Sequence, residues 1–410
     1  MDANGNFVIT VVFTGEIDFS LLFANITLIT KVKFVMYSNI RIVSLKGMFS
    51  HCSSLQIVDF GTYDFKGVTD MSDLFYGCES LTTVTFHSEL KTTSVTTVKQ
   101  MFYGCKVLTK IDLTAFSFES VEDMSYIFYG CEVLTNVNFA KTVSLTKVTS
   151  IEYMFGYCSE YSHVDFTGFT FGSLVSVESL FYGCYKLSSI TFGSFDCTKC
   201  RSISRMFYEC KELVTVDFST FYTSIELKNT ESVFYGNTKL ESVNMHGFKI
   251  GGPCTCQMFG QCGCSKFKHL DLSNAEFDSS IEASAFFSGI ELRFMNINLE
   301  GAVMSRKFYN YMKKQGAVIS GTPTLKGSDD NDESNTKKKK SSNTLSGGAV
   351  AGIVVATVAV VVVVVTVTVV SVSASTAAVA GGAAVATTAA ATMGSQSGLA
   401  AATAAASAAV

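Results

Sequence analysis

Cysteine is the residue type best suited to chemistry in this sequence, and it is closely spaced in three places. These are CTKC at 197–200, CTC at 254–256 and CGC at 262–264. The last two place four thiols within eleven residues, the ligand number of a structural zinc site. However, C-x-C pairs lack the usual two-residue gap, and Cys262 or Cys264 also continues a regular cysteine series. We therefore predict no metal site, and local disulfides if this region is extracellular.

The regular cysteine series differs from these close pairs, because its members recur every 26 or 27 residues. It consists of Cys52, Cys78, Cys105, Cys131, Cys158, Cys184 and Cys210. Free cysteine is among the residue types most often buried, so this spacing predicts a structural ladder of thiols in narrow apolar slots. Disulfides between neighbouring repeats are sterically conceivable, but the ladder does not need them.

No set of residues has the arrangement of a catalytic site. The five histidines are scattered, and the sequence has neither a P-loop nor a G-x-S-x-G turn. The formal net charge of −4 provides no basic field for nucleic acid. We predict a protein that is not an enzyme, requires no cofactor and does not bind nucleic acid.

A repeat defines the elements that position these residues. Marker phenylalanines such as Phe75 and Phe128 are each followed by the frame C-x-x-L-x-x-V-x-F, which recurs after Phe102 with Ile111 and Leu113 in its last two apolar positions. The V-x-F part has the period of a short strand, whereas the following F-x-x-V-x-x-M-x-x-M-F stretch suggests a short helical or 3₁₀ return. Because a single coil cannot cover its own apolar face, the sequence predicts an α/β-type solenoid. We expect about ten coils of 26–27 residues with short parallel strands.

Two columns of side chains along this solenoid are candidates for ligand contact. The residue between the two apolar strand positions points outward and is acidic at Asp59, Asp112, Asp165, Asp217 and Asp271. The residue after the marker phenylalanine is Tyr76, Tyr103, Tyr129, Tyr182, Tyr208 and Tyr235. The aspartates are either a solvated polar ladder or a negative stripe that attracts basic ligands or cations. The tyrosines either stack at the coil edge or contact a partner protein.

The frame together with its MF-x-x-C corner resembles the leucine-rich repeats of the BspA-like surface antigen family, over roughly residues 45–300. The resemblance implies a non-enzymatic surface protein that binds host, matrix or other partner proteins. It supplies no catalytic residues and no ligand identity.

Outside the repeats, composition divides the chain into further segments. We predict an N-terminal β-rich cap at 1–44, a C-terminal cap at 301–322, a charged flexible linker at 323–348, a transmembrane helix at 349–370 and an Ala/Ser/Thr-rich tail at 371–410. Residues 349–370 carry no charge and, as a helix, would span about 33 Å. Valine also favours strands, so a buried or aggregating strand is the alternative for this segment.

The expected location depends on how the chain is oriented. Four lysines at 337–340 precede the apolar segment and nothing basic follows it, which by the positive-inside rule places the repeats in the cytosol. The family resemblance places them outside. We favour a single-pass protein of the cell surface. The alternative is a tail-anchored scaffold that faces the cytosol on an internal membrane and binds intracellular proteins.

Overall fold

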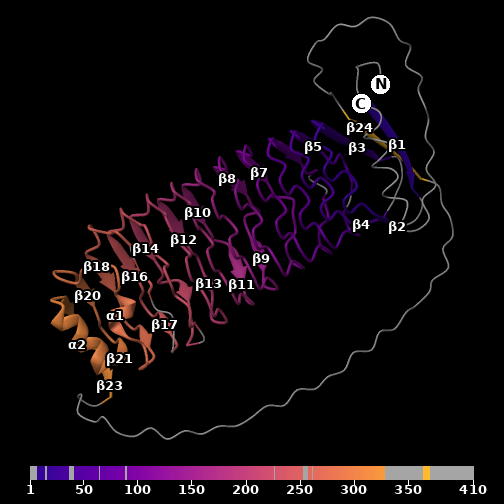
Figure 1. The fold of residues 1–410 in the computed structure, drawn as a ribbon. Coiled ribbons are helices and arrows are strands. Elements are labelled where there is room, and N and C mark those ends of the chain that lie inside the picture. The colour runs from indigo at the N-terminus through magenta and orange to yellow at the C-terminus, as the bar shows by residue number, and fades with distance from the viewer. Residues whose placement is uncertain are drawn as a thin grey trace, which may run out of the picture.

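The computed structural model describes residues 7–13, 16–36, 41–63, 65–87, 90–225, 227–252, 257–260, 262–327 and 363–369. Within these ranges the chain winds into an elongated solenoid of about eleven coils (Figure 1). Strands one coil apart pair in parallel, as in β5 (Ile57–Asp59) and β6 (Thr83–Thr85), where Val58 lies opposite Val84. A solenoid with short parallel strands is therefore confirmed.

One long side of the solenoid is a sheet face with one strand per coil. Its strands, besides β5 and β6, are β3 (Lys31–Met36), β7 (Lys110–Asp112), β8 (Asn136–Asn138), β10 (His163–Asp165), β12 (Ser189–Thr191), β14 (Thr215–Asp217), β16 (Ser242–Asn244), β18 (His269–Asp271), β20 (Asn296–Asn298) and β22 (Val318–Ser320). The central residue of nearly every three-residue strand is buried and its neighbours face outward. This is the alternation expected of a sheet with one face on the core.

A second side carries parallel strands of two or three residues. They are β9 (Val143–Leu145), β11 (Phe169–Phe171), β13 (Phe195–Asp196), β15 (Phe221–Tyr222), β17 (Lys249–Ile250), β19 (Glu276–Phe277), β21 (Val303–Ser305) and β23 (Thr324–Lys326). The third side is held by single parallel bridges that run from coil to coil. These bridges join Ser44, Asp70, Thr97, Asp123, Ser150, Ser176, Ser202 and Asn229, a column called here the turn ladder.

The return segment is not helical, so the α/β part of the prediction is wrong. Between the turn ladder and the marker phenylalanine, the chain forms turns that contain a left-handed residue, such as Gln100 with φ of 57°. The backbone N–H groups donate to the next coil, for example from Phe102 to the Ile127 carbonyl at 2.9 Å. Hydrogen bonding between coils thus replaces the i to i−4 bonds of a helix. Among the described residues, the helices are α1 (Ala283–Phe286) and α2 (Arg306–Lys314).

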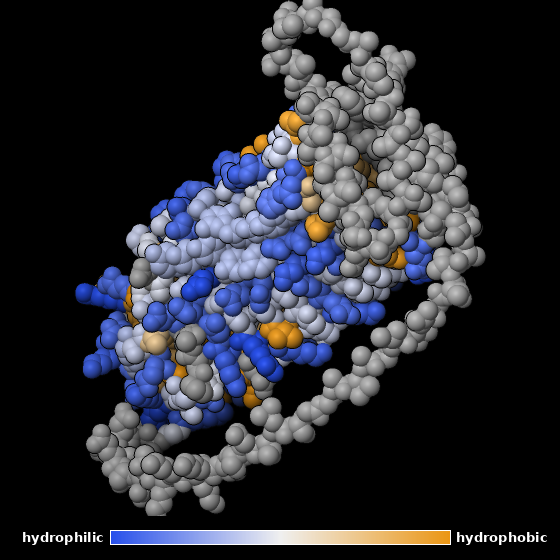
Figure 2. All heavy atoms as spheres, turned by 45° about the vertical axis from the view of Figure 1, so that its right-hand side comes forward, coloured by the Kyte–Doolittle hydropathy of each residue, from blue (hydrophilic) through white to orange (hydrophobic). Residues whose placement is uncertain are grey.

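The core is organised around a stack of the marker phenylalanines. Consecutive rings from Phe23 to Phe259 lie nearly parallel, with centroids 5.3 to 5.8 Å apart. This spacing exceeds the strand separation of about 4.8 Å, so the rings are offset rather than directly superposed. On the surface shown in Figure 2, orange hydrophobic atoms are few along the coils, as expected when the apolar side chains lie inside.

The two ends continue the solenoid. Residues predicted as the N-terminal cap include β2 (Glu16–Asp18), which pairs in parallel with β4 (Arg41–Ser44), and Phe23, whose ring stacks on Phe49. At the other end, α2 buries Phe308 and Met312 against the last coils. Strand β23 pairs with β21 and lies within the segment predicted as a linker. Residues 328–348 and 371–410 lie outside the described residues.

The transmembrane helix predicted at 349–370 is not supported. The structure describes residues 363–369 of that segment, and they form strand β24 (Val363–Val369) between β1 (Phe7–Phe13) and β3 (Figure 1). Both pairings are antiparallel. Valine and threonine are β-branched and favour strands, and β1 and β3 offer backbone groups for pairing. Among the described residues no helix is both long and apolar enough to cross a membrane.

Candidate functional site

The seven ladder cysteines are buried and carry free thiols. Each Sγ–H donates to the carbonyl of the marker phenylalanine that precedes it by 29 or 30 residues, as from Cys131 to Phe102 at 3.2 Å. Asn237 takes the place of cysteine in one coil, and its Nδ2 donates to the Phe207 carbonyl at 2.8 Å. The ladder position therefore requires a small side chain with a hydrogen-bond donor. This requirement is more specific than the prediction that the thiols only fill narrow apolar slots.

Burial also makes these thiols unreactive. Desolvation raises the pKa of Cys52 to about 12, and it raises the pKa of Cys105, Cys158 and Cys210 well above the ordinary value. A nucleophilic or metal-binding cysteine needs a lowered pKa. Burial and raised pKa values are what a packing role of the ladder predicts.

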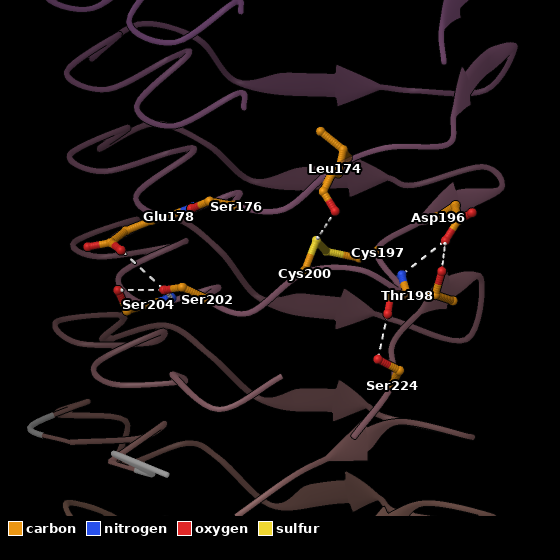
Figure 3. The surroundings of a disulfide bond; sticks show 10 residues. All are labelled: Leu174, Ser176, Glu178, Asp196, Cys197, Thr198, Cys200, Ser202, Ser204 and Ser224. Atoms are coloured by element: carbon orange, nitrogen blue, oxygen red, sulfur yellow. Dashed lines mark hydrogen bonds between the residues drawn. A yellow bond between two sulfur atoms is a disulfide. The ribbon is translucent and has the colours of Figure 1, made fainter. Parts of the chain in front are cut away.

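The closely spaced cysteines form local disulfides where the structure describes them. Cys197 is bonded to Cys200 and Cys262 to Cys264, whereas CTC at 254–256 lies outside the described residues. Figure 3 shows that the first disulfide lies beside a polar cluster, in which the Asp196 carboxylate accepts from the Thr198 hydroxyl at 2.6 Å. Within the described part of the chain, no group of three or more His, Cys, Asp or Glu side chains could hold a metal ion.

The aspartates of the sheet face lie at the ends of their strands and point outward. Each Oδ1 accepts the N–H of the residue two positions later at 2.8 or 2.9 Å, as Asp112 does from Thr114. Hydrogen bonds from Thr114 hold the pKa of Asp112 below its usual value. Asn244 and Asn298 accept the same bond without a charge. The hydrogen bond of this turn therefore uses a side-chain oxygen that aspartate and asparagine both provide. The negative charge of the aspartates is not needed for it.

Sequence reasoning missed a second outward column on this face. The first residue of each strand also points outward, which places Lys110, His163 and His269 beside the aspartate column. The alternation in x-V-x would have revealed this column. Asp59 also has a cationic neighbour, because Lys33 Nζ lies 3.5 Å from its Oδ2.

The predicted tyrosines form a half-buried stack along one corner of the coils. Tyr76 and Tyr103 lie 4.5 Å apart between ring centroids, and Tyr103 and Tyr129 lie 4.8 Å apart. Tyr182, Tyr208 and Tyr235 stack in the same way at 4.6 and 4.3 Å. Desolvation by burial, followed by neighbouring tyrosines, raises the pKa of Tyr129 to about 12.

Three further tyrosines, which sequence reasoning missed, join the two halves of the stack. Tyr157 makes edge contacts with Tyr129 at 5.5 Å and with Tyr182 at 5.3 Å. Tyr126 and Tyr153 stack on one another at 4.8 Å beside them. The reversed spelling FGYC at 155–158, in place of FYGC, was the signal available in the sequence. The result is one continuous tyrosine column from Tyr76 to Tyr235.

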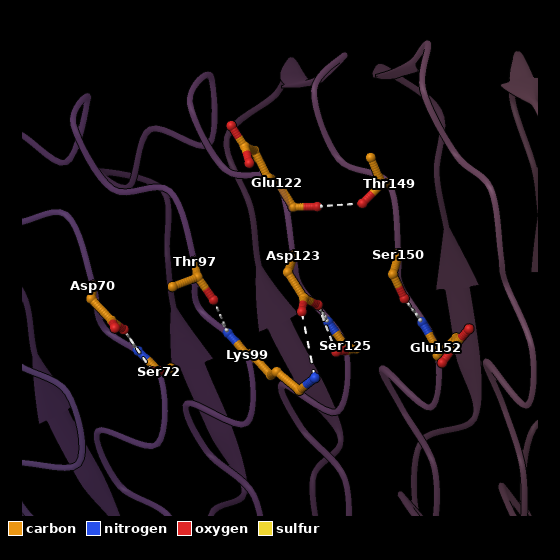
Figure 4. A network of polar contacts seen from close by, with 10 residues as sticks. All are labelled: Asp70, Ser72, Thr97, Lys99, Glu122, Asp123, Ser125, Thr149, Ser150 and Glu152. Atoms are coloured by element: carbon orange, nitrogen blue, oxygen red, sulfur yellow. Dashed lines mark hydrogen bonds and ion pairs between the residues drawn. The ribbon is translucent and has the colours of Figure 1, made fainter. Parts of the chain in front are cut away.

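The turn ladder runs along the neighbouring side of the coils (Figure 4). In each coil the ladder side chain accepts the N–H of the residue two positions later, as Asp123 Oδ1 does from Ser125 at 2.8 Å and Ser150 Oγ from Glu152 at 3.3 Å. Figure 4 also shows the Lys99 side chain reaching to Asp123, with Nζ 3.6 Å from Oδ2. The residue two positions after the ladder residue is a buried serine in some coils, as at Ser125, and is only partly buried at Glu152 and Glu178.

An open groove of about 630 Å³ crosses the second side of the solenoid. Phe116, Phe118 and Phe169 form its apolar floor, while serines, threonines and glycines line much of the rest. It holds no pair of side chains arranged as a nucleophile and a base.

These features define a parallel β-solenoid with extended polar and aromatic columns. Sequence comparison matches residues 43–169, 136–248 and 175–296 to the family described as "Mycoplasma protein of unknown function, DUF285". The matched segments overlap and together cover more than half of the chain, so the chain belongs to this family. The family description does not mention BspA-like antigens, and that resemblance stays a prediction.

Among solved structures, the chain is similar to an internalin from Listeria monocytogenes and to the pneumococcal vaccine antigen PcpA. The internalin is 9% identical with a TM-score of 0.24, and the match covers 69% of this chain and 78% of the internalin. PcpA is 12% identical with a TM-score of 0.26, and the match covers 76% of this chain and 79% of PcpA. At these TM-scores the similarity carries no argument, and the strand pairing defines the fold. No curated protein matches the sequence.

Proposed function

We propose that the solenoid is a protein-binding module and that the tyrosine column is its principal contact surface. The observation that carries this proposal is the continuous, half-buried stack from Tyr76 to Tyr235. Tyrosine presents a large contact area with little entropy to lose, and it is enriched in protein interfaces. Neighbouring rings hold each other in place, so the surface is ordered before a partner arrives.

The proposed role is binding without catalysis. The free thiols are buried with raised pKa values, and the sheet-face carboxylates accept turn hydrogen bonds. An extended column that repeats along the coils suits a long partner surface better than a small substrate.

We place the module at the cell surface, where it would bind host, matrix or other partner proteins. The BspA-like resemblance of the repeats supports this location, and the disulfide between Cys197 and Cys200 fits an oxidising compartment. The alternative is a scaffold for intracellular proteins. The lysine run at 337–340 does not decide between the two locations, because the positive-inside rule applies to a transmembrane helix and the helix predicted after these lysines is not supported.

The location is tested by antibody staining of cells that express the full chain with an N-terminal tag. Staining of intact cells is the expected result. Staining only after permeabilisation would exclude surface display and support the intracellular scaffold.

Binding is tested by adhesion of the purified full chain to immobilised matrix proteins. Replacing Tyr208 and Tyr235 with serine should reduce adhesion at least fivefold. Replacing Asp112 and Asp217 with asparagine serves as the matched control and should leave adhesion within twofold. Equal adhesion of the wild-type chain and the tyrosine variant would reject the tyrosine column as the contact surface.

A further inference from the structure

The tyrosine column changes its geometry at one place. The regular column position after the marker phenylalanine is Gly156, and a Cβ atom there would come within 2.7 Å of Tyr129 Cδ2. The next residue, Tyr157, occupies the left-handed position that glycine holds in most coils, with φ of 56°. The exchange of Tyr and Gly turns this ring edge-on to Tyr129. The single row of stacked rings thereby becomes a cluster.

Tyr129 lies at the centre of this cluster. Tyr103 stacks on one side of it, while Tyr126, Tyr153 and Tyr157 contact it at centroid distances of 5.6, 5.8 and 5.5 Å. Tyr126 and Tyr153 are also in the left-handed region, at φ of 59° and 51°. This conformation belongs to the repeat, since Asp73, Gln100 and Ser179 share it at the equivalent position of their coils, and it places both rings at the same corner of successive coils. The five rings, Tyr103, Tyr126, Tyr129, Tyr153 and Tyr157, are called here the tyrosine cluster.

Two carboxylates stand beside the tyrosine cluster. Glu152 and Glu178 occupy the position two residues after the turn ladder, and their carbonyls accept the N–H of Tyr126 and of Tyr153 at 2.8 and 3.0 Å. These hydrogen bonds make both glutamates neighbours of the cluster in the next coil. Burial, then Tyr153, Glu152, Tyr103 and Glu178 raise the pKa of Tyr126, in agreement with this position.

The charge at this position changes sign along the molecule. It is lysine in earlier coils, at Lys46 and Lys99, and glutamate at Glu152 and Glu178. Lys99 is already paired with Asp123. Within the part of the chain that the structure describes, no lysine or arginine forms an ion pair with Glu152 or Glu178. Glu178 instead accepts from the Ser202 hydroxyl at 3.1 Å, as Figure 3 shows.

We propose that the tyrosine cluster, with Glu152 and Glu178, binds the cationic side chains of a lysine- or arginine-rich segment of the protein partner. Aromatic rings attract a cation through their negative faces, and carboxylates beside them add charge complementarity. A cation near the rings and the two glutamates would supply the ion-pair partner that neither glutamate has among the described residues. This inference rests on the proposed function and names the chemistry of the partner at one part of the column.

The test uses the purified full chain and a fluorescent octalysine peptide, with binding followed by anisotropy at low salt. The control ligand is the same peptide with every lysine acetylated, which removes the charge. We expect the octalysine peptide to bind and the acetylated peptide to bind at least tenfold more weakly. Peptide binding is also measured in magnesium chloride and in sodium chloride at the same ionic strength. Equal binding in the two salts is expected of a site for side-chain cations, whereas weaker binding in magnesium chloride would indicate a general attraction of cations.

The protein variants separate the rings from the carboxylates. Glu152→Gln together with Glu178→Gln should weaken peptide binding at least fivefold, and so should Tyr153→Leu. Tyr153→Phe keeps the ring and should bind within twofold of the wild type. The matched control is Asp112→Asn with Asp165→Asn on the sheet face, which should also stay within twofold. Thermal melting of each variant checks that the solenoid is intact.

Equal binding of the acetylated and unacetylated peptides would overturn the inference. So would an unchanged affinity in the Glu152/Glu178 variant, or a loss confined to the sheet-face variant, which would assign the basic segment to the aspartates. If the Glu152/Glu178 variant adheres to matrix proteins like the wild type while the Tyr208/Tyr235 variant does not, this inference fails and the proposed function stands. If no tyrosine variant changes adhesion but the peptide results hold, the cluster binds basic segments, while the tyrosine column fails as the contact surface for matrix proteins.

Discussion

At the residue scale, each ladder position must provide a donor inside the core. The marker phenylalanine carbonyl accepts one bond from the N–H of its own corner, as Phe75 does from Cys78, and a second from the thiol of the next coil. A thiol provides that second donor without burying another strong polar atom. Asn237 provides the donor but also buries Oδ1, which has no hydrogen-bond partner in the structure.

This difference predicts that Asn237→Cys stabilises the protein. The variant keeps a donor to the Phe207 carbonyl and removes an unpaired buried acceptor, so we expect a gain of about 1 kcal/mol in the free energy of unfolding. Urea denaturation measures it. Asn237→Ala is the control, because it removes the donor as well and should lower stability. A lower urea midpoint for Asn237→Cys than for the wild type would contradict the role assigned to the thiol.

At the element scale, the corner after the marker phenylalanine is a turn that needs a left-handed residue. Gly77, Gly104 and Gly130 hold this position with φ between 68° and 70°. Glu209 holds it at φ of 57° in a later coil. A side chain in this region costs about 1–2 kcal/mol, whereas glycine adopts it freely. Glu209 has little to offset the cost, since its ion pair with Lys211 is exposed.

Glu209→Gly should therefore stabilise the corner, by about 0.5–1 kcal/mol after the extra entropy of glycine in the unfolded chain is included. Thermal and urea unfolding measure the change. Glu132→Gly, at an exposed position without positive φ, is the matched control and should destabilise. The same sign of change in both variants would show that the left-handed backbone is not the cause.

At the scale of the whole molecule, the contributions of the seven ladder thiols to the free energy of unfolding add up along the array. The seven ladder thiols have raised pKa values because burial disfavours the thiolate. In the unfolded chain these thiols ionise near pH 9, the ordinary value. Between pH 9 and the higher folded values, unfolding releases protons that the folded chain retains. Stability is therefore fully present below about pH 9 and falls as the pH rises above it.

We predict a steep loss of stability in alkaline solution. Each thiol contributes a slope of up to about 1.4 kcal/mol per pH unit. The urea midpoint at pH 10.5 should be well below that at pH 8, and Cys131→Ser, which keeps a hydroxyl donor but does not ionise, should reduce the slope by one thiol's share. Identical midpoints at the two pH values would contradict the burial of the ladder thiols.

The repeat, its period, the parallel strands and the inward series of phenylalanine and cysteine could all be predicted from the order of the residues. Stacking places equivalent residues of neighbouring coils in contact, so Cys105 and Cys131 must occupy equivalent sites. The fold of the return segment could not be predicted in this way, because its three-residue spacing fits a helix and a series of turns equally well. Hydrogen bonds to the next coil, such as that from Phe102 to Ile127, select the turns.

Residue spacing was likewise insufficient to predict the full tyrosine column and the conformation of the valine segment. Tyr76 and Tyr103 were evident from the repeat, whereas Tyr153 and Tyr157 occupy other repeat positions and join the column through ring contacts with Tyr129 that the spacing does not report. Valine repeats at 363–369 satisfy both a helix and a strand, and pairing with β1 and β3, from the other end of the chain, decided for the strand. Periodicity fixes which residues are equivalent, but contacts between segments distant in sequence decide the conformation wherever local preferences are balanced.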